Sequence, residues 1–183
     1  HWYLASVYFY LHFQYNGFFI FSCLGLFFSE CNTLFPQFKY NKLFFKLFYV
    51  SFIPAYFLST LWAKLPVWLY IITVIAAFTQ VFAWIKIIKA IILALKSGSN
   101  LNKFQSYLFL FVGIAFTVKL LLQLGSTIPS VSDLAFGFRP IVIAYLHLVL
   151  LGVISAFILA FIYTFNLIVV NKLTAIAFSV FLI

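Results

Sequence analysis

The stretch PVWLYIITVIAAFTQVFAWIKII, residues 66–88, decides the fold class. Nearly all of its side chains are apolar, it contains no acid, and its one charged residue is Lys86. About 20 consecutive apolar residues, wound as an α-helix, are enough to cross the hydrocarbon core of a bilayer. We therefore expect residues 66–88 to form a transmembrane helix.

Applied outward along the chain, the same length rule predicts five full spans and a sixth that is cut short. The other full spans cover about residues 3–28, 43–62, 104–124 and 140–167, and the sixth begins near Leu173. Pro54 should kink the second span. Polar segments at 30–37, 96–103 and 125–133 read as loops, and the turn at 63–65 is short enough to make an antiparallel hairpin of its two neighbouring spans.

Composition extends this conclusion to the whole chain. Hydrophobic residues make up 67% of the sequence and charged residues 7%, whereas a soluble domain has about 25% charged residues. We predict an all-α, polytopic integral membrane bundle that forms a single transmembrane domain over residues 1–183, with the lipid bilayer as its main partner. The sequence starts at His1, has no Met and stops at Ile183 within an apolar run, so we expect a fragment of a longer chain.

The basic residues indicate an orientation rather than a nucleic-acid partner, because they punctuate apolar runs instead of clustering on a polar domain. Eight of them fall on one side of the predicted topology: Lys39, Lys42, Lys46, Lys86, Lys89, Lys96, Lys103 and Lys172. Lys64 and Arg139 fall on the other side. Since basic loops stay in the cytoplasm, we expect a bacterial inner (plasma) membrane protein with its N-terminal end outside. Lys119 lies inside the fourth span and should snorkel towards the outer side.

The first span carries the richest set of polar residues. Tyr8, His12 and Asn16 are spaced four apart and share one helical face, which Cys23 roughly continues. A polar stripe is costly in lipid, so it should face the bundle or a cavity. Gly17 and Gly25 would allow close approach of another helix or a flat ligand.

A second histidine, His147, is almost the only strongly polar group in the outer half of the fifth span. Both histidines occur in the pattern Tyr-Leu-His with a Gly five residues later, at Gly17 and Gly152. The predicted topology places both imidazoles at similar depth, pointing into the bundle. Two such imidazoles can hold one metal ion or one haem. The alternative for each is a hydrogen bond to a neighbouring helix and nothing more.

The segments His12-Phe-Gln14-Tyr-Asn-Gly17 and His147-Leu-Val-Leu-Leu-Gly152 resemble helices of bacterial membrane proteins related to haem–copper oxidase subunit I, including nitric-oxide-response relatives. The resemblance implies that His12 and His147 are ligands of haem or copper. It also implies that Gly17 and Gly152 make room for the macrocycle, and that Gln14 matches a glutamine frequent two residues after the first His. Redox sensing, electron transfer or NO handling would follow. The adjacent His-His pair of that family is absent here, so further ligands would lie outside this sequence.

Other functions stay open at this point. A small-molecule permease would use the Tyr8, His12 and Asn16 stripe together with the kink at Pro54. A non-catalytic assembly subunit would bind other membrane subunits. We find no Gly-rich phosphate loop, no paired carboxylates and no nucleophile set, so no reaction is assigned. We expect four further amides to hydrogen-bond between helices: Gln80, Gln105, Gln123 and Asn166.

Overall fold

The structure, a computed structural model, describes residues 2–39, 42–63, 65–167, 176–177 and 180. All regular structure in this part of the chain is helical. Five helical segments are long and apolar enough to cross a membrane: Trp2–Leu34, Lys42–Ala63, Val67–Ser97, Lys103–Gly125 and Arg139–Thr164. The predicted all-α class and the five full spans are confirmed. The predicted sixth span begins outside the described residues, and Lys172 also lies outside them.

Three of the five spans are not uniformly α-helical. The first span consists of α1 (Trp2–Leu11), the π-helix η1 (His12–Phe19) and α2 (Ile20–Leu34). The second consists of α3 (Lys42–Phe52) and the 3₁₀-helix η2 (Pro54–Ala63), and the third and fourth are α4 (Val67–Ser97) and α5 (Lys103–Gly125). The fifth consists of α7 (Arg139–His147), the π-helix η3 (Leu148–Ser155) and α8 (Ala156–Thr164).

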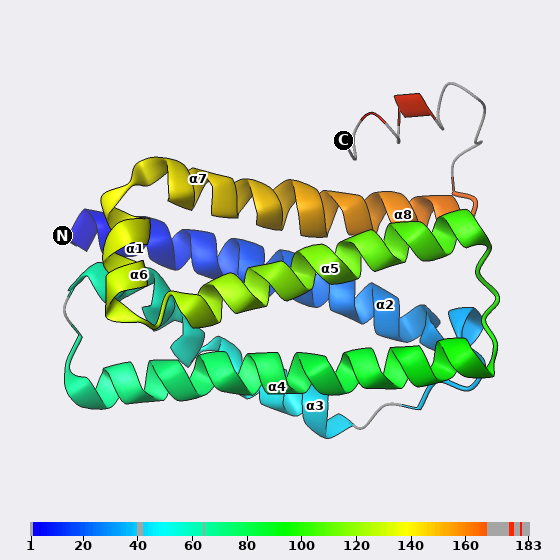
Figure 1. The fold of residues 1–183 in the computed structure, drawn as a ribbon, viewed down its shortest axis with the longest axis horizontal. Coiled ribbons are helices and arrows are strands. Elements are labelled where there is room, and N and C mark those ends of the chain that lie inside the picture. The colour runs from blue at the N-terminus through cyan, green and yellow to red at the C-terminus, as the bar shows by residue number, and fades with distance from the viewer. Residues whose placement is uncertain (1, 40–41, 64, 168–175, 178–179, 181–183) are drawn as a thin grey trace.

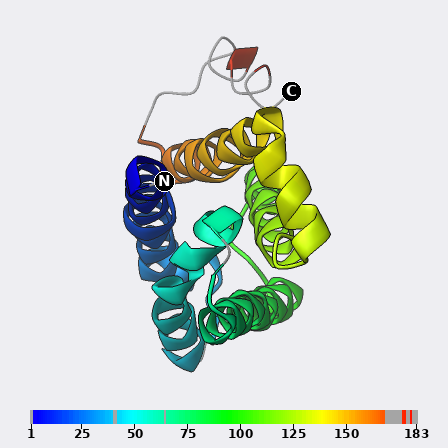
Figure 2. The ribbon, with the colours of Figure 1, turned by 90° about the vertical axis from the view of Figure 1, so that its left-hand side faces the viewer.

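The spans lie side by side along the long axis of the molecule (Figure 1). Trp2, the end of η2 and the start of α7 lie at one end, which we call the N-terminal end. The end of α4 and the start of α5, with Lys96 and Lys103, lie at the other, which we call the lysine end. Viewed from the N-terminal end, the spans surround a central region into which η2 projects (Figure 2). Consecutive spans pack on one another, with close backbone contacts from α3 to α4, from α4 to α5, and from α5 to η3 and α8.

Pro54 breaks the second span, as predicted. Proline has no N–H, so the α-helical ladder cannot continue through it. The chain tightens into the 3₁₀-helix η2, and the Tyr56 N–H donates to the Ile53 carbonyl over 3.2 Å. In an α-helix that N–H would have bonded to Phe52. The carbonyl of Phe52 therefore lacks its helical partner.

Two predicted loops are wrong in part: α2 continues to Leu34, into the expected loop 30–37, and the expected loop 125–133 contains a helix. Residues 125–133 were expected to be irregular, but the structure contains the short helix α6 (Pro129–Gly137) at the N-terminal end. Pro129 occupies the first turn, directly after the extended residue Ile128, where its missing N–H costs nothing. The side chain of Ser132 is buried, so α6 packs onto the bundle instead of standing free of it.

One of the amides expected between helices, Gln105, serves a helix end instead. Asn102 caps α5, and its side chain accepts from the Gln105 N–H while the Gln105 side chain accepts from the Asn102 N–H, both over 2.8 Å. This reciprocal pair is a capping box. Asn166 follows α8 with a positive φ of 52°, a conformation that asparagine tolerates better than most residues.

The prediction that Lys119 snorkels is also wrong. Its side chain is 2% exposed, and its Nζ lies 5.4 Å from the centroid of the Phe116 ring. Phe116 is one turn before Lys119 on α5, so the ammonium rests on an aromatic face of its own helix. The fourth span thus carries a basic side chain in its packed interior.

The π winding of η1 brings the first two spans close together. A Cβ built on Gly17 would lie 2.9 Å from Phe52 Cζ, whereas a Cβ on Gly25 meets nothing within 4 Å. The expected close approach is therefore confirmed at Gly17, where the partner is the Phe52 ring, and wrong at Gly25.

We expect Gly17→Ala to lower the free energy of unfolding by about 1–3 kcal/mol, because the Phe52 ring is packed and must move. Gly25→Ala is the matched control and should leave stability unchanged or raise it by up to about 1 kcal/mol, since alanine favours helix. Unfolding of both variants in detergent measures the difference. Equal effects at the two positions would show that Phe52 is not wedged against Gly17.

Candidate intramembrane binding site

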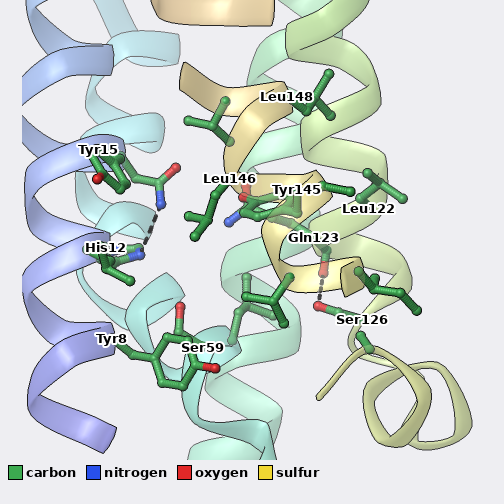
Figure 3. A pocket seen from close by; sticks show the side chains of 18 of the residues that line it. Tyr8, His12, Tyr15, Ser59, Leu122, Gln123, Ser126, Tyr145, Leu146 and Leu148 are labelled. Carbon is green, nitrogen blue, oxygen red and sulfur yellow. Dashed lines mark hydrogen bonds between the residues drawn. The ribbon is translucent and has the colours of Figure 1, made fainter. Parts of the chain in front are cut away.

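A cavity of about 440 Å³ lies in the half of the bundle nearer the N-terminal end. The first, second, fourth and fifth spans form its walls, together with α6. Figure 3 shows the first span on one side of it and α5 with α7 on the other. Most of its lining is apolar or aromatic. Its polar lining residues are Tyr8, His12, Asn16, Ser59, Gln123, Ser126 and Tyr145, along with Tyr15.

The predicted polar stripe faces this cavity. Tyr8, His12 and Asn16 all line it, as the cost of polar groups in lipid requires. Gln14 lies on the same span but does not line the cavity. Cys23, expected to continue the stripe, lines a second cavity nearer the lysine end.

His12 links the first span to the break in the second. Its Nε2 lies 3.1 Å from the Phe52 carbonyl oxygen, the oxygen left without a helical partner by Pro54. The imidazole also stacks on the Phe52 ring, with centroids 4.8 Å apart and planes at 12°. The side chain is 3% exposed. His12 therefore satisfies a backbone acceptor that would otherwise be unpaired inside the membrane.

For a neutral ring, this bond selects the tautomer of His12 and, through it, the orientation of Asn16. A carbonyl can only accept, so Nε2 carries the proton and Nδ1 of the neutral ring is an acceptor. Asn16 Nδ2 lies 3.5 Å from that Nδ1 and is placed to donate to it. The amide oxygen of Asn16 is then turned away, and it is buried without a hydrogen-bond partner. The hydrogen-bond network, not an arbitrary choice of amide orientation, leaves an acceptor free.

Gln123 supplies a second free acceptor from the opposite wall. Its side chain is 8% exposed, it lines the cavity from α5, and its Oε1 is buried without a partner. Figure 3 shows Gln123 across the cavity from His12. The sequence pointed to Gln123 only as an interhelical amide, and that expectation fails for its oxygen. Gln80 has a similarly unpartnered oxygen, but it lines neither cavity.

The five-residue spacing from His12 to Gly17 has a structural meaning in the first span. In a π-helix residue i bonds to residue i+5, so residues five apart share a face. His12 and Gly17 lie within the same π-helix, and both contact the Phe52 ring. In an α-helix they would point about 140° apart. The His-x-x-x-x-Gly spacing here fits a π-helix in which both residues pack against one aromatic ring.

The second histidine does not take the predicted position. His147 is exposed, it does not line the cavity, and its Nδ1 donates to the Ile143 carbonyl of its own helix over 2.8 Å. The expectation that both imidazoles point into the bundle is right for His12 and wrong for His147. α7 and η3 are wound so that Tyr145 and Val149 line the cavity instead. The geometry therefore does not supply the two facing ligands that the haem or copper hypothesis needs.

The glycines also have protein neighbours. A Cβ on Gly152 would lie 3.3 Å from Leu148 Cδ1 and 3.5 Å from the Ala115 Cβ on α5. Gly152 thus brings η3 close to α5, as Gly17 brings η1 close to Phe52. Among the described residues, no group of three or more His, Cys, Asp or Glu side chains could hold a metal ion.

The second cavity, of about 330 Å³, continues along the bundle towards the lysine end. On α5, Gln123 lines the first cavity and Phe116 the second. Lys119 lies between them in sequence and lines neither, and it is an electrostatic neighbour of His12. The layer between the cavities therefore contains a buried basic side chain.

Comparison with known proteins adds no family. No protein-family model matches the chain, and neither a curated protein nor a solved structure matches it.

We expect His12→Leu to lower the free energy of unfolding by about 1–3 kcal/mol, because it leaves the Phe52 carbonyl without a donor. His147→Leu should change it by less than about 0.5 kcal/mol, since His147 is exposed and bonds only within its own helix. Unfolding of both variants in detergent checks this. A haem absorption band that is lost in both variants would contradict the assignment of His12 as an interhelical hydrogen-bond donor.

Proposed function

We propose that this chain is a small-molecule permease, and that the cavity near the N-terminal end is its binding site. One observation carries the proposal: the three segments that depart from α winding all line this cavity. His12 and Asn16 belong to η1, Ser59 to η2, and Leu148 to η3. Interrupted helices of this kind frame the substrate sites of many transporters, since they free polar backbone and side-chain groups at membrane depth.

The walls select the chemistry of the bound molecule. Asn16 and Gln123 line the cavity, and their amide oxygens are buried acceptors without a partner, so we infer that the molecule presents N–H or O–H donors to which these side chains can turn. An uncharged molecule fits best, because these amides cannot neutralise a buried cation and no acid lines the cavity. The aromatic walls, which include Tyr15, Phe136 and Tyr145, suit a flat apolar body. We infer a neutral, partly apolar molecule with hydrogen-bond donors.

The proposal includes an orientation. The exposed lysines Lys39, Lys42, Lys46, Lys89, Lys96 and Lys103 lie towards the lysine end, and basic loops remain in the cytoplasm. The cavity would then lie in the outer half of a bacterial plasma membrane.

Ser130→Cys and Ser97→Cys test this orientation, because both positions are exposed and they lie towards opposite ends. The native thiols of Cys23 and Cys31 are buried and should stay unlabelled. On intact cells, a membrane-impermeant maleimide should label Cys at position 130 and reach position 97 only after permeabilisation. The reverse pattern would invert the topology.

Gln123→Leu tests the site itself, with Gln80→Leu as the matched control. Each change removes a buried oxygen that has no partner, so neither should destabilise the fold. Indole, which has one N–H donor, should stabilise the wild type and Gln80→Leu against thermal unfolding, and 1-methylindole should stabilise them less. We expect Gln123→Leu to weaken indole binding about 5- to 10-fold, the value of one hydrogen bond at about 1 kcal/mol.

Transport is measured separately, by the re-swelling of proteoliposomes after a hyperosmotic shift with acetamide, a small neutral donor. Wild-type and Gln80→Leu vesicles should swell faster than empty liposomes, and Gln123→Leu vesicles should lose much of that gain. Swelling equal to that of empty liposomes would overturn the permease assignment. Co-purification of the chain with a larger complex, without binding of either indole, would favour an assembly subunit.

A further inference from the structure

The second cavity is almost purely apolar. Aromatic and aliphatic side chains line it, among them Phe27, Trp84, Phe109 and Phe157. Its deepest polar groups are already paired, because Trp84 Nε1 donates to Thr117 Oγ1 over 2.9 Å and Thr117 Oγ1 donates to the Gly113 carbonyl over 2.7 Å. Because Trp84 and Thr117 are already paired, neither requires a polar ligand as a hydrogen-bond partner.

The size of this space indicates that it holds a molecule. Its volume of about 330 Å³ is twice that of an engineered apolar cavity of about 150 Å³ that binds benzene. An empty space of this size would deprive its lining of dispersion contacts. In a bilayer the apolar material at hand is the lipid acyl chain, which is as apolar as the leucine side chains of the protein. Filling the space with a chain therefore costs little, and it does not by itself select one lipid over another.

Charged residues near the cavity supply a preference for one class of lipid over another. Leu95 and Leu101 line the cavity, and the exposed Lys96 and Lys103 stand one and two residues beyond them. Ser106, one turn after Lys103, also lines it. Glu30 is the only acidic residue of the first span, so few negative side chains are present to offset the positive charges of Lys96 and Lys103. Basic residues beside a gap between helices bind the phosphate of an anionic headgroup.

We propose that the second cavity binds one acyl chain of an anionic phospholipid, with its headgroup held by Lys96 and Lys103. The site is separate from the binding site near the N-terminal end, and it does not depend on the permease assignment. The fold contains both requirements in one place: an apolar slot with no unpaired polar group in its depth, and two exposed amines beside its rim.

Native mass spectrometry of the full-length protein tests the headgroup. The probes are phosphatidylglycerol and phosphatidylcholine with identical palmitoyl and oleoyl chains. Each lysine near an anionic headgroup contributes a factor of about five, so phosphatidylglycerol should bind roughly 25-fold more tightly. The Lys96→Gln/Lys103→Gln double variant should abolish that preference. The matched control, Lys42→Gln/Lys46→Gln on α3, should keep it, because α3 does not line the cavity.

A second pair of variants tests the slot. A Cβ on Gly113, which lines the cavity, meets nothing within 4 Å, and the same is true of Gly25, which lines neither cavity. Gly113→Leu should fill the slot and lower phosphatidylglycerol binding at least 10-fold, while Gly25→Leu should not. Equal binding of the two lipids to the wild type, or an unchanged preference in Lys96→Gln/Lys103→Gln, would overturn the proposal even if Gly113→Leu failed to fold.

Discussion

The hydrogen bond from His12 to the Phe52 carbonyl is the interaction on which the rest of the binding site depends. Inside a bilayer no water is available to satisfy a backbone group, and each unsatisfied one costs several kcal/mol. In the 3₁₀-helix that starts at Pro54, the Tyr56 N–H bonds to Ile53 instead of Phe52, and a donor from a neighbouring span takes its place at the Phe52 carbonyl. That donor fixes the tautomer of the neutral His12 ring, the tautomer orients Asn16, and the amide oxygen of Asn16 is left without a hydrogen-bond partner. One proline thus leads, through the Phe52 carbonyl, His12 and Asn16, to the chemistry of the proposed site.

The spans and the polar stripe could be predicted because they follow from solvation alone. Length and apolar composition decide which segments cross the bilayer, and Tyr8, His12 and Asn16 had to avoid lipid. The errors come from packing that no local pattern encodes. His147 faces outward because the winding of α7 and η3 directs Tyr145 and Val149 inward. Lys119 is buried, and its Nζ lies over the ring of Phe116, one turn away. The orphaned oxygen of Gln123 is visible only once every neighbour has been placed.

The two cavities divide the bundle by chemistry. The one near the N-terminal end is lined on opposite walls by Asn16 and Gln123, whose buried amide oxygens have no partner, and the one near the lysine end has Trp84 and Thr117 already paired. Lys119 lies at the level between them. The chain contains only two acids, Glu30 and Asp133, and Asp133 is exposed on α6. This layer therefore contains a basic side chain without a carboxylate counter-ion. It lies between a cavity that has polar lining residues and one whose lining is almost entirely apolar.

The π-helices η1 and η3 have a consequence for how such a chain can change over evolutionary time. Each lies in the middle of a span and sets the rotational phase between its two halves. A π-helix bonds residues five apart and so holds more residues per turn than an α-helix. Deleting a single residue from His12–Phe19 would therefore let the segment return to α winding with α1 and α2 still in phase, and the span would remain long enough to cross the bilayer. His12 and Gly17 would then no longer share the face that contacts Phe52. Selection on this span therefore acts on the residue count between His12 and Gly17, because a one-residue deletion there keeps the span and removes the geometry around Phe52.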